Sequence, residues 1–284
     1  MTRVTEDLWA REWPAPAKIN LFLHVVGRRA DGYHLLQTVF RFLDFGDSLH
    51  FSPRADGLVR LTTPLPGVPA ESDLTVRAAR SLQAAAAVSQ GVDITLIKRL
   101  PLGGGLGGGS SDAATVLLAL NRLWQLQLPD ARLQQLGLSL GADLPIFIHG
   151  RAAFAEGVGE RFSDVALPPA CYLVLVPPVA VPTAKIFAAP QLRRDAPPLL
   201  AAQWTPGQGG NDLEAVACQL FPEIRRHLDL LRAYGVARMS GSGACVFAEF
   251  ATMQAATAAQ AQLPGDVSSF VARGVDRHPL RELT

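Results

Sequence analysis

One short segment constrains this chain more than any other: six of the seven residues at 103–109 are glycine, and two serines follow. The segment joins a predicted strand at 92–97 to a predicted helix at 112–126. Glycine allows backbone dihedrals that turn successive N–H groups inward, and it lets a large anion approach closely. The helix behind it adds unpaired N–H groups and the positive end of its dipole. The arrangement therefore predicts a phosphate-binding loop.

A flexible linker that ends in a serine N-cap is the other interpretation of this segment. We favour the phosphate loop, because linkers do not usually lie between a regular strand and a well-formed helix. The Walker pattern is excluded, since no lysine precedes Ser110. The glycine spacing at 103–108 also matches the dinucleotide-binding fingerprint. That fold needs a second parallel strand, however, and here another predicted helix follows at 131–140.

The composition narrows the class of protein. Of 284 residues, 49% are apolar and 18% charged, which indicates a globular chain with a large core. The 26 basic and 25 acidic residues leave a charge of +1 with no basic block, which argues against nucleic-acid or membrane partners. Three dispersed cysteines form no C-x-x-C pair, and no H-E-x-x-H occurs, so we expect neither disulfides nor a zinc site. Residues 1–7 contain no apolar leader, so we expect a cytoplasmic protein.

Strands and helices are expected to be mixed along the whole chain, which predicts an α+β fold. Strands are predicted at 17–26, 33–43, 49–51, 58–62, 92–97, 171–176, 245–250 and 268–273. Helices are predicted at 73–87, 112–126, 131–140, 212–220, 222–234 and 252–262. A weakly patterned, proline-bearing stretch at 162–169 predicts a boundary between two domains, 1–165 and 166–284.

The loop at 101–111 (PLGGGLGGGSS) resembles the phosphate loop of the GHMP kinases, which include galactokinase, homoserine kinase and mevalonate kinase. Further segments at 16–23 (PAKINLFL), 29–34 (RADGYH), 141–145 (GADLP), 211–212 (ND) and 240–247 (SGSGACVF) are similar to the branch of that family whose alcohol substrate carries a cytidylyl group. The resemblance implies a ribosomal-protein-S5-like N-terminal domain that binds ATP. It also implies a ferredoxin-like C-terminal domain, with the substrate in the cleft between the two.

Lys18 and Asp143 match the catalytic pair of the family. Read alone, Lys18 is an ordinary strand-end lysine, and Asp143 is a helix cap ahead of Pro145. The resemblance implies instead that Asp143 takes the proton of the acceptor hydroxyl and that Lys18 supplies positive charge beside it. Asn20 projects from the same face of the first strand as Lys18, so we expect it to contact the substrate.

The resemblance also implies a cytosine-binding site at Tyr33 and His34, directly after an Asp-Gly turn. A tyrosine ring offers a stacking face, and an imidazole can bond to a base edge. Phe187 is expected to close the other side of the base, with Thr183 and Val158 nearby. An exposed aromatic, a solvated histidine and a core phenylalanine are the alternative interpretations of Tyr33, His34 and Phe187.

The expected contacts with ATP are Lys98, Pro101, Leu102, Gly103, Gly104, Gly105, Leu106, Gly107, Gly108, Gly109, Ser110 and Ser111. Magnesium is expected to accompany ATP, with no dedicated metal site on the protein. Two residues depart from the expected pattern. Asp112 places a negative charge beside an anion site, so it must face solvent, a cation or magnesium. Asp73 stands where the family's adenine pocket would have asparagine.

Two rival functions remain at this point. A sibling kinase acting on homoserine or mevalonate would keep the loop but would not need Tyr33 and His34. A regulator that binds ATP without turnover would not require Lys18 and Asp143 together. We expect a monomer or a weak homodimer that binds ATP and a small cytidylyl substrate, and neither nucleic acid nor membrane.

Overall fold

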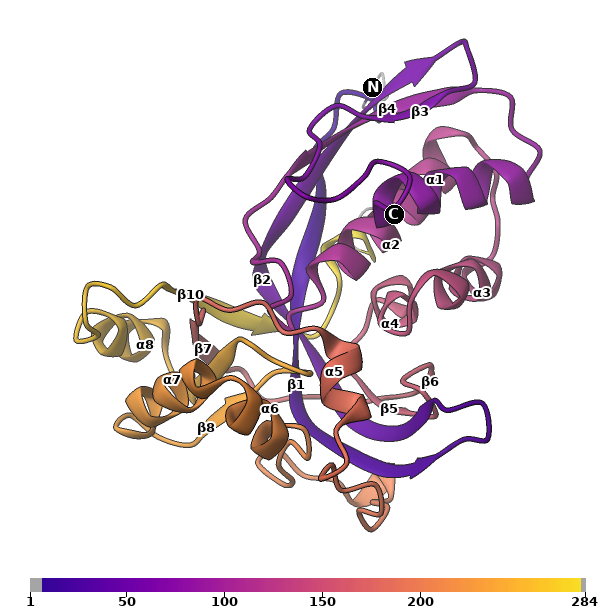
Figure 1. Cartoon of the computed structure of the whole chain (residues 1–284). Helices are drawn as coiled ribbons and strands as arrows, with labels where there is room; N and C mark the ends of the chain where they lie inside the picture. The colour runs from indigo at the N-terminus through magenta and orange to yellow at the C-terminus, as the bar shows by residue number, and fades with distance from the viewer. Residues whose placement is uncertain (1–6, 282–284) are drawn as a thin grey trace.

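The computed structural model describes residues 7–281 and contains one mixed sheet with helices packed against it (Figure 1). The expectation of no apolar leader concerned residues 1–7, and the first six of these lie outside this range. The strands are β1 (Trp13–Arg28), β2 (His34–Arg54), β3 (Val59–Leu61), β4 (Gly91–Ile97), β5 (Ala153–Glu156), β6 (Arg161–Asp164), β7 (Cys171–Leu175), β8 (Ala237–Met239), β9 (Val246–Phe250) and β10 (Ser269–Val275). Their main order is β3-β4-β2-β10-β7-β9-β8, with β1 and β5 paired to β2, and β6 paired to β5.

The helices cover the sheet in two groups (Figure 1). They are α1 (Leu74–Ala85), α2 (Gly108–Leu123), α3 (Asp130–Leu140), α4 (Leu144–His149), α5 (Thr183–Ala188), α6 (Glu214–Leu220), α7 (Pro222–Arg232) and α8 (Met253–Gln260), with short 3-10 turns η1 (Ala201–Gln203) and η2 (Pro279–Arg281). Helices α1 to α4 pack in one apolar core with β2 and β4, and α6 and α7 pack in another with β7 and β9. The α+β class predicted from the sequence is confirmed. Among residues 7–281, no helix is long and apolar enough to span a membrane.

The long hairpin of β1 and β2 forms the spine of the fold. The sequence predicted two strands, at 33–43 and 49–51, but the structure has the single strand β2 across both. Gly46 lies between the two predicted segments and permits a close approach: a Cβ there would lie 2.2 Å from the carbonyl oxygen of Ala15 on β1. The glycine therefore lets the two paired strands approach closely at this point, and β2 continues through it.

Strand β10 connects the strands of the N-terminal half to those of the C-terminal half. Its first five residues pair with β7, and its last two, Gly274 and Val275, pair with β2. A third apolar core lies across this junction and contains side chains from β1, β7 and β9. The boundary predicted near residue 165 stays a prediction, because the sheet continues from one half of the chain into the other.

Candidate active site

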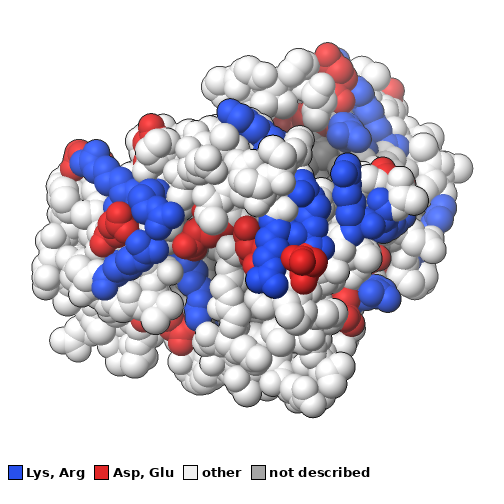
Figure 2. Space-filling model, turned by 60° about the horizontal axis from the view of Figure 1, so that its bottom comes forward, with Lys and Arg blue, Asp and Glu red and all other residues white. Residues whose placement is uncertain are grey.

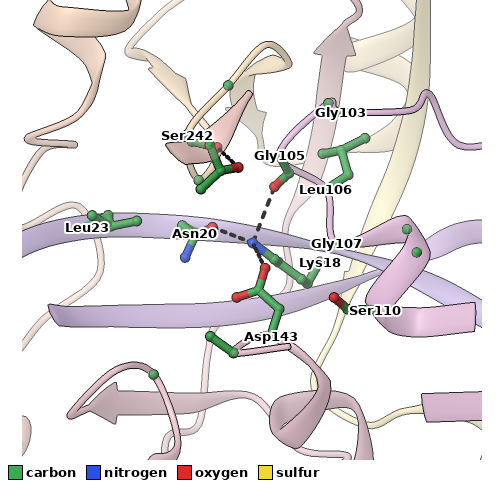
Figure 3. Close-up of a pocket in the computed structure, with 18 of the residues that line it drawn as sticks. Lys18, Asn20, Leu23, Gly103, Gly105, Leu106, Gly107, Ser110, Asp143 and Ser242 are labelled. Carbon is green, nitrogen blue, oxygen red and sulfur yellow. Dashed lines mark hydrogen bonds and ion pairs between the residues drawn. The ribbon is translucent and has the colours of Figure 1, made fainter. Parts of the chain in front are cut away.

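A cavity of about 510 Å³ lies between the glycine loop, the β1–β2 hairpin and the C-terminal half of the chain (Figure 3). The predicted residues that line it are Lys18, Asn20, Pro101, Leu102, Gly103, Gly104, Gly105, Leu106, Gly107, Gly108, Gly109, Ser110, Asp143, Val158, Thr183 and Phe187. The fold therefore brings most of the predicted site residues together, although they come from five separate stretches of sequence.

The glycine loop needs glycine for two physical reasons. Gly103, Gly105 and Gly107 have φ angles of 65°, 74° and 72°, in the left-handed region that other residues seldom adopt. A Cβ on Gly105 would also lie 2.1 Å from the carbonyl oxygen of Ser240. The loop therefore combines an unusual backbone path with close packing against a second glycine-rich turn, at 240–243.

Helix α2 begins at Gly108, inside the glycine run, so its predicted start at Asp112 was wrong. Gly107 supplies the turn in place of a serine N-cap. Ser110 therefore lies in the first turn and lines the cavity. Ser111 is fully buried, and its hydroxyl donates to the carbonyl oxygen of Pro16 at 2.7 Å. The first N–H groups of α2 have no carbonyl within the helix to accept from them, so this end of the cavity attracts anions.

Lys18 is the centre of the polar contacts in the cavity (Figure 3). It projects from β1 and is only 2% exposed. Its Nζ lies 3.2 Å from Asp143 Oδ2, donates to Asn20 Oδ1 at 2.8 Å, and approaches the carbonyl oxygen of Gly105 at 3.3 Å. The side chain of Asp143 is 40% exposed. A fixed lysine thus holds a carboxylate that remains open to a ligand in the cavity.

The turn at 240–243 was noted in the sequence only as a motif, and its serines were not among the predicted contacts. Ser240 Oγ donates to the carbonyl oxygen of Gly105 at 2.9 Å, and Ser242 and Thr183 share a hydrogen bond of 2.8 Å between their hydroxyls. Asn211 holds this turn by donating to the carbonyl oxygens of Met239 and Gly241, both at 2.8 Å. The second glycine turn therefore supports the phosphate loop from behind.

Lys98 lies beside the loop but not in the lining of the main cavity. Its Nζ contacts two buried carboxylates, Asp47 Oδ2 at 2.5 Å and Asp112 Oδ2 at 2.8 Å. Asp47 Oδ1 also accepts from the N–H groups of Arg99 and Leu100, at 2.6 and 2.8 Å. Asp112 thus faces a cation, which is one of the three environments expected for it. The sequence analysis did not single out Asp47.

Burial dominates the electrostatics of this group of charges. It raises the pKa of Asp112 to about 8. The attraction of Lys98 opposes this rise, and the repulsion of Asp47 adds to it. Burial also disfavours the Lys98 ammonium, but Asp112 and Asp47 outweigh it, and the pKa of Lys98 is raised above its ordinary value. Burial therefore favours a protonated Asp112 carboxyl beside the Lys98 ammonium.

A smaller cavity of about 150 Å³ adjoins the glycine loop at Gly109 and includes Lys98, Asp73 and Leu74 in its lining. Asp73 caps α1 by accepting from the N–H of Thr75 at 2.8 Å. The carboxylate that stands in place of the expected asparagine therefore has a clear structural role.

The residues predicted to recognise cytosine divide into two groups. Val158, Thr183 and Phe187 line the main cavity. Tyr33, at the tip of the hairpin, is 62% exposed and lies outside that lining. His34 also lies outside it, but its ring packs on Phe187 with centroids 4.9 Å apart. In residues 7–281 there is no cluster of three or more His, Cys, Asp or Glu side chains suited to a metal ion.

The sequence of this chain matches two family models and is similar to known kinases. Family models described as the GHMP kinases N terminal domain and the GHMP kinases C terminal match residues 73–151 and 198–267. The 4-diphosphocytidyl-2-C-methyl-D-erythritol kinase of Dechloromonas aromatica is 61% identical, covering 96% of this chain and 100% of that protein. Its counterpart from Thiobacillus denitrificans is 59% identical over 95% of this chain and 98% of its own length.

Solved structures extend the comparison to three dimensions. A crystal structure of 4-(cytidine 5'-diphospho)-2C-methyl-D-erythritol kinase has a TM-score of 0.80 and 38% identity, covering 93% of this chain and 99% of that one. A mevalonate kinase structure, with a TM-score of 0.68 at 14% identity and coverage of 94% and 100%, shares the fold alone. The resemblance and the fold class predicted from the sequence are thus confirmed. The chain belongs to the GHMP kinases, and within them to the group of 4-diphosphocytidyl-2-C-methyl-D-erythritol kinases.

Proposed function

We propose that this chain transfers the γ-phosphate of ATP to the 2-hydroxyl of 4-diphosphocytidyl-2-C-methyl-D-erythritol. The product is the 2-phosphate, an intermediate of non-mevalonate isoprenoid biosynthesis. The observation that carries the proposal is the ion pair of Lys18 and Asp143, which lies beside the glycine loop in one cavity. The choice of substrate is supported by the relative of that name, which is 61% identical along almost all of the chain.

The residues of the cavity divide the chemistry between them. Phosphoryl transfer needs the acceptor hydroxyl aligned with the γ-phosphorus, a base for its proton and positive charge near the transferring group. Asp143 accepts the proton of the hydroxyl, while Lys18 holds the carboxylate in place and offsets negative charge. The glycine loop and the N-terminus of α2 bind the phosphates through backbone N–H groups.

Magnesium enters as part of the Mg·ATP substrate and neutralises phosphate charge. Hard oxygen donors suit this ion, and the cavity offers the Ser110 hydroxyl at the phosphate end. The adenine occupies the smaller cavity near Lys98 and Leu74, which adjoins the phosphate loop at Gly109. The role of Lys98 and the loop residues in binding ATP is part of this proposal.

The cytidylyl group lies at the opposite end of the main cavity, where Phe187, Val158 and Thr183 line the wall. His34, whose ring packs against Phe187, bonds to the edge of the base, and exposed Tyr33 stacks on the base when substrate binds. Asn20, held by Lys18 and by Thr38 Oγ1 at 2.9 Å, contacts the erythritol part.

The proposed setting is the cytoplasm, with the chain acting as a monomer or a weak homodimer. Figure 2 shows Lys and Arg side chains interspersed with Asp and Glu on one face of the molecule. Nucleic-acid and anionic membrane partners require a clustered positive field, whereas the 26 basic and 25 acidic residues leave a charge of only +1, and this balance supports small-molecule ligands.

A coupled ADP-release assay tests the proposal with a panel of alcohols that includes the cytidylyl substrate, mevalonate and homoserine. We expect turnover only with the cytidylyl compound. Turnover of mevalonate or homoserine alone would identify a sibling kinase and refute the substrate. ATP binding without turnover of any alcohol would indicate a regulator.

A further inference from the structure

Arg194 connects two elements that both belong to the proposed cytosine end of the site. Its Nη2 donates to the carbonyl oxygens of Phe187 and Ala189, at 3.1 and 2.8 Å, where α5 ends. Its Nη1 donates to the carbonyl oxygen of Leu192 at 2.9 Å. Its Nε donates to His34 Nε2 at 3.0 Å, at the start of β2. One guanidinium thus fixes the position of Phe187 and of His34 together.

The contact between Arg194 and His34 determines where the imidazole carries its proton. A guanidinium has only donors and stays charged at all relevant pH values. A nitrogen that accepts from it must present a lone pair, so His34 Nε2 is unprotonated and the ring is neutral. The single proton of a neutral imidazole then lies on Nδ1, which makes Nδ1–H a hydrogen-bond donor.

We propose that Arg194 is a positioning residue that holds His34 as a neutral, Nδ1-protonated donor to the pyrimidine of the substrate. This inference rests on the proposed function, which places the pyrimidine beside His34 and Phe187. Cytosine presents acceptors at its ring nitrogen and carbonyl oxygen, which match a fixed N–H donor. Arg194 is therefore a determinant of base binding, and local sequence patterns do not reveal it.

Burial and the charges around His34 also favour the neutral form of its ring. Burial, Arg194 and Arg28, in that order, lower the pKa of His34 below its ordinary value. Arg28 pairs with His34 in the hairpin register, and Arg194 faces the ring from the segment after α5. Together they keep the ring neutral at pH values where a free histidine would begin to ionise.

The first test measures the protonation of His34 in the whole wild-type protein and needs no variant. Nitrogen-15 NMR of the wild-type histidines at about pH 8 should show His34 with a proton on Nδ1 and a bare Nε2. Its titration should lie below about pH 6.5, the ordinary value. A proton on Nε2, or an ordinary titration, would overturn the inference even if the enzyme is fully active.

Arg194→Met gives the functional test, with Arg193→Met as the matched control. Arg193 is an exposed neighbour whose Nε pairs with the exposed Asp195 at 3.1 Å. At about pH 8 we expect Arg194→Met to raise the KM for the cytidylyl substrate roughly fivefold, as expected for one lost neutral hydrogen bond, with kcat little changed. The control should match wild type.

The pH dependence separates positioning of the proton from mere structural damage. Below about pH 6 in Arg194→Met, His34 ionises, both ring nitrogens carry protons, and the KM should return toward wild type. The substrate is a diphosphate diester with no group that titrates in this range. An equal loss at both pH values, or no loss at about pH 8, would refute the inference. Inactive wild-type enzyme would refute the proposed function instead and would leave the NMR result unaffected.

Discussion

Replacing Asp112 with asparagine should remove a specific pH dependence from the stability of this protein. Asp112 is buried in the first turns of α2, and its Oδ2 accepts from Lys98. Its other oxygen, Oδ1, is buried and has no hydrogen-bond partner among residues 7–281. An ionised carboxylate is therefore poorly satisfied here, whereas a protonated one is tolerated. Asparagine is close in shape, keeps an acceptor for Lys98 and cannot ionise.

The size of the effect follows from the pKa. In the folded chain the pKa of Asp112 is raised from 3.8 to about 8. Between these values the folded state binds a proton that the unfolded chain has released, so the free energy of unfolding falls as pH rises. Between about pH 6 and about pH 8 the loss is about 2 kcal/mol for one such group. Lys98, whose pKa is raised above 10.5, stays protonated in both states over this range.

Urea unfolding of wild type and Asp112→Asn at about pH 6, 7 and 8 measures this difference directly. Wild type should lose about 2 kcal/mol across the range relative to Asp112→Asn. Asp195→Asn is the control, because the Asp195 side chain is 85% exposed, and it should follow wild type. Parallel stability curves for wild type and Asp112→Asn would refute the reasoning about this buried carboxyl.

Three further changes test the packing around the loop. Lys98→Met removes the cation from two buried carboxylates and should cost about 3–5 kcal/mol in urea unfolding; a loss below about 1 kcal/mol would contradict the ion pairs. Gly105→Ala places an alanine in the left-handed region, which costs roughly 1–2 kcal/mol, and its Cβ would clash with the carbonyl oxygen of Ser240. The KM for ATP should therefore rise at least about tenfold in steady-state assays. An unchanged KM would refute the loop geometry. Ser111→Ala leaves the carbonyl oxygen of Pro16 without its donor and should cost about 1–3 kcal/mol by urea unfolding, and a neutral change would contradict that bond.

Local sequence patterns predicted much of the fold but little of the geometry of the site. The alternation of apolar residues predicted β1, and the glycine run predicted a strand–loop–helix unit, because both signals are local. The single strand β2 was missed, since the close approach at Gly46 depends on its partner strand. Helix α5 was missed because its six residues are too few to show a helical period.

The ion pair of Lys18 and Asp143 could not be found from spacing alone. Lys18 and Asp143 lie far apart in sequence, and each has an ordinary local interpretation, so only the family resemblance joined them. The structure then placed them 3.2 Å apart. Asp47 and Arg194 carried no signal at all. Each acts through contacts with distant segments, which no local pattern in a single sequence can show.

The most direct test of the account is Asp143→Asn, studied by single-turnover phosphorylation of the cytidylyl substrate and by equilibrium binding of ATP. Asparagine keeps the shape of the side chain but cannot accept the proton of the hydroxyl. We expect the rate of phosphoryl transfer to fall by about 10²–10⁴, while the Kd for ATP changes little, because the phosphates are bound by the loop. A transfer rate close to that of wild type would contradict the role of Asp143 as the base, and with it the central claim.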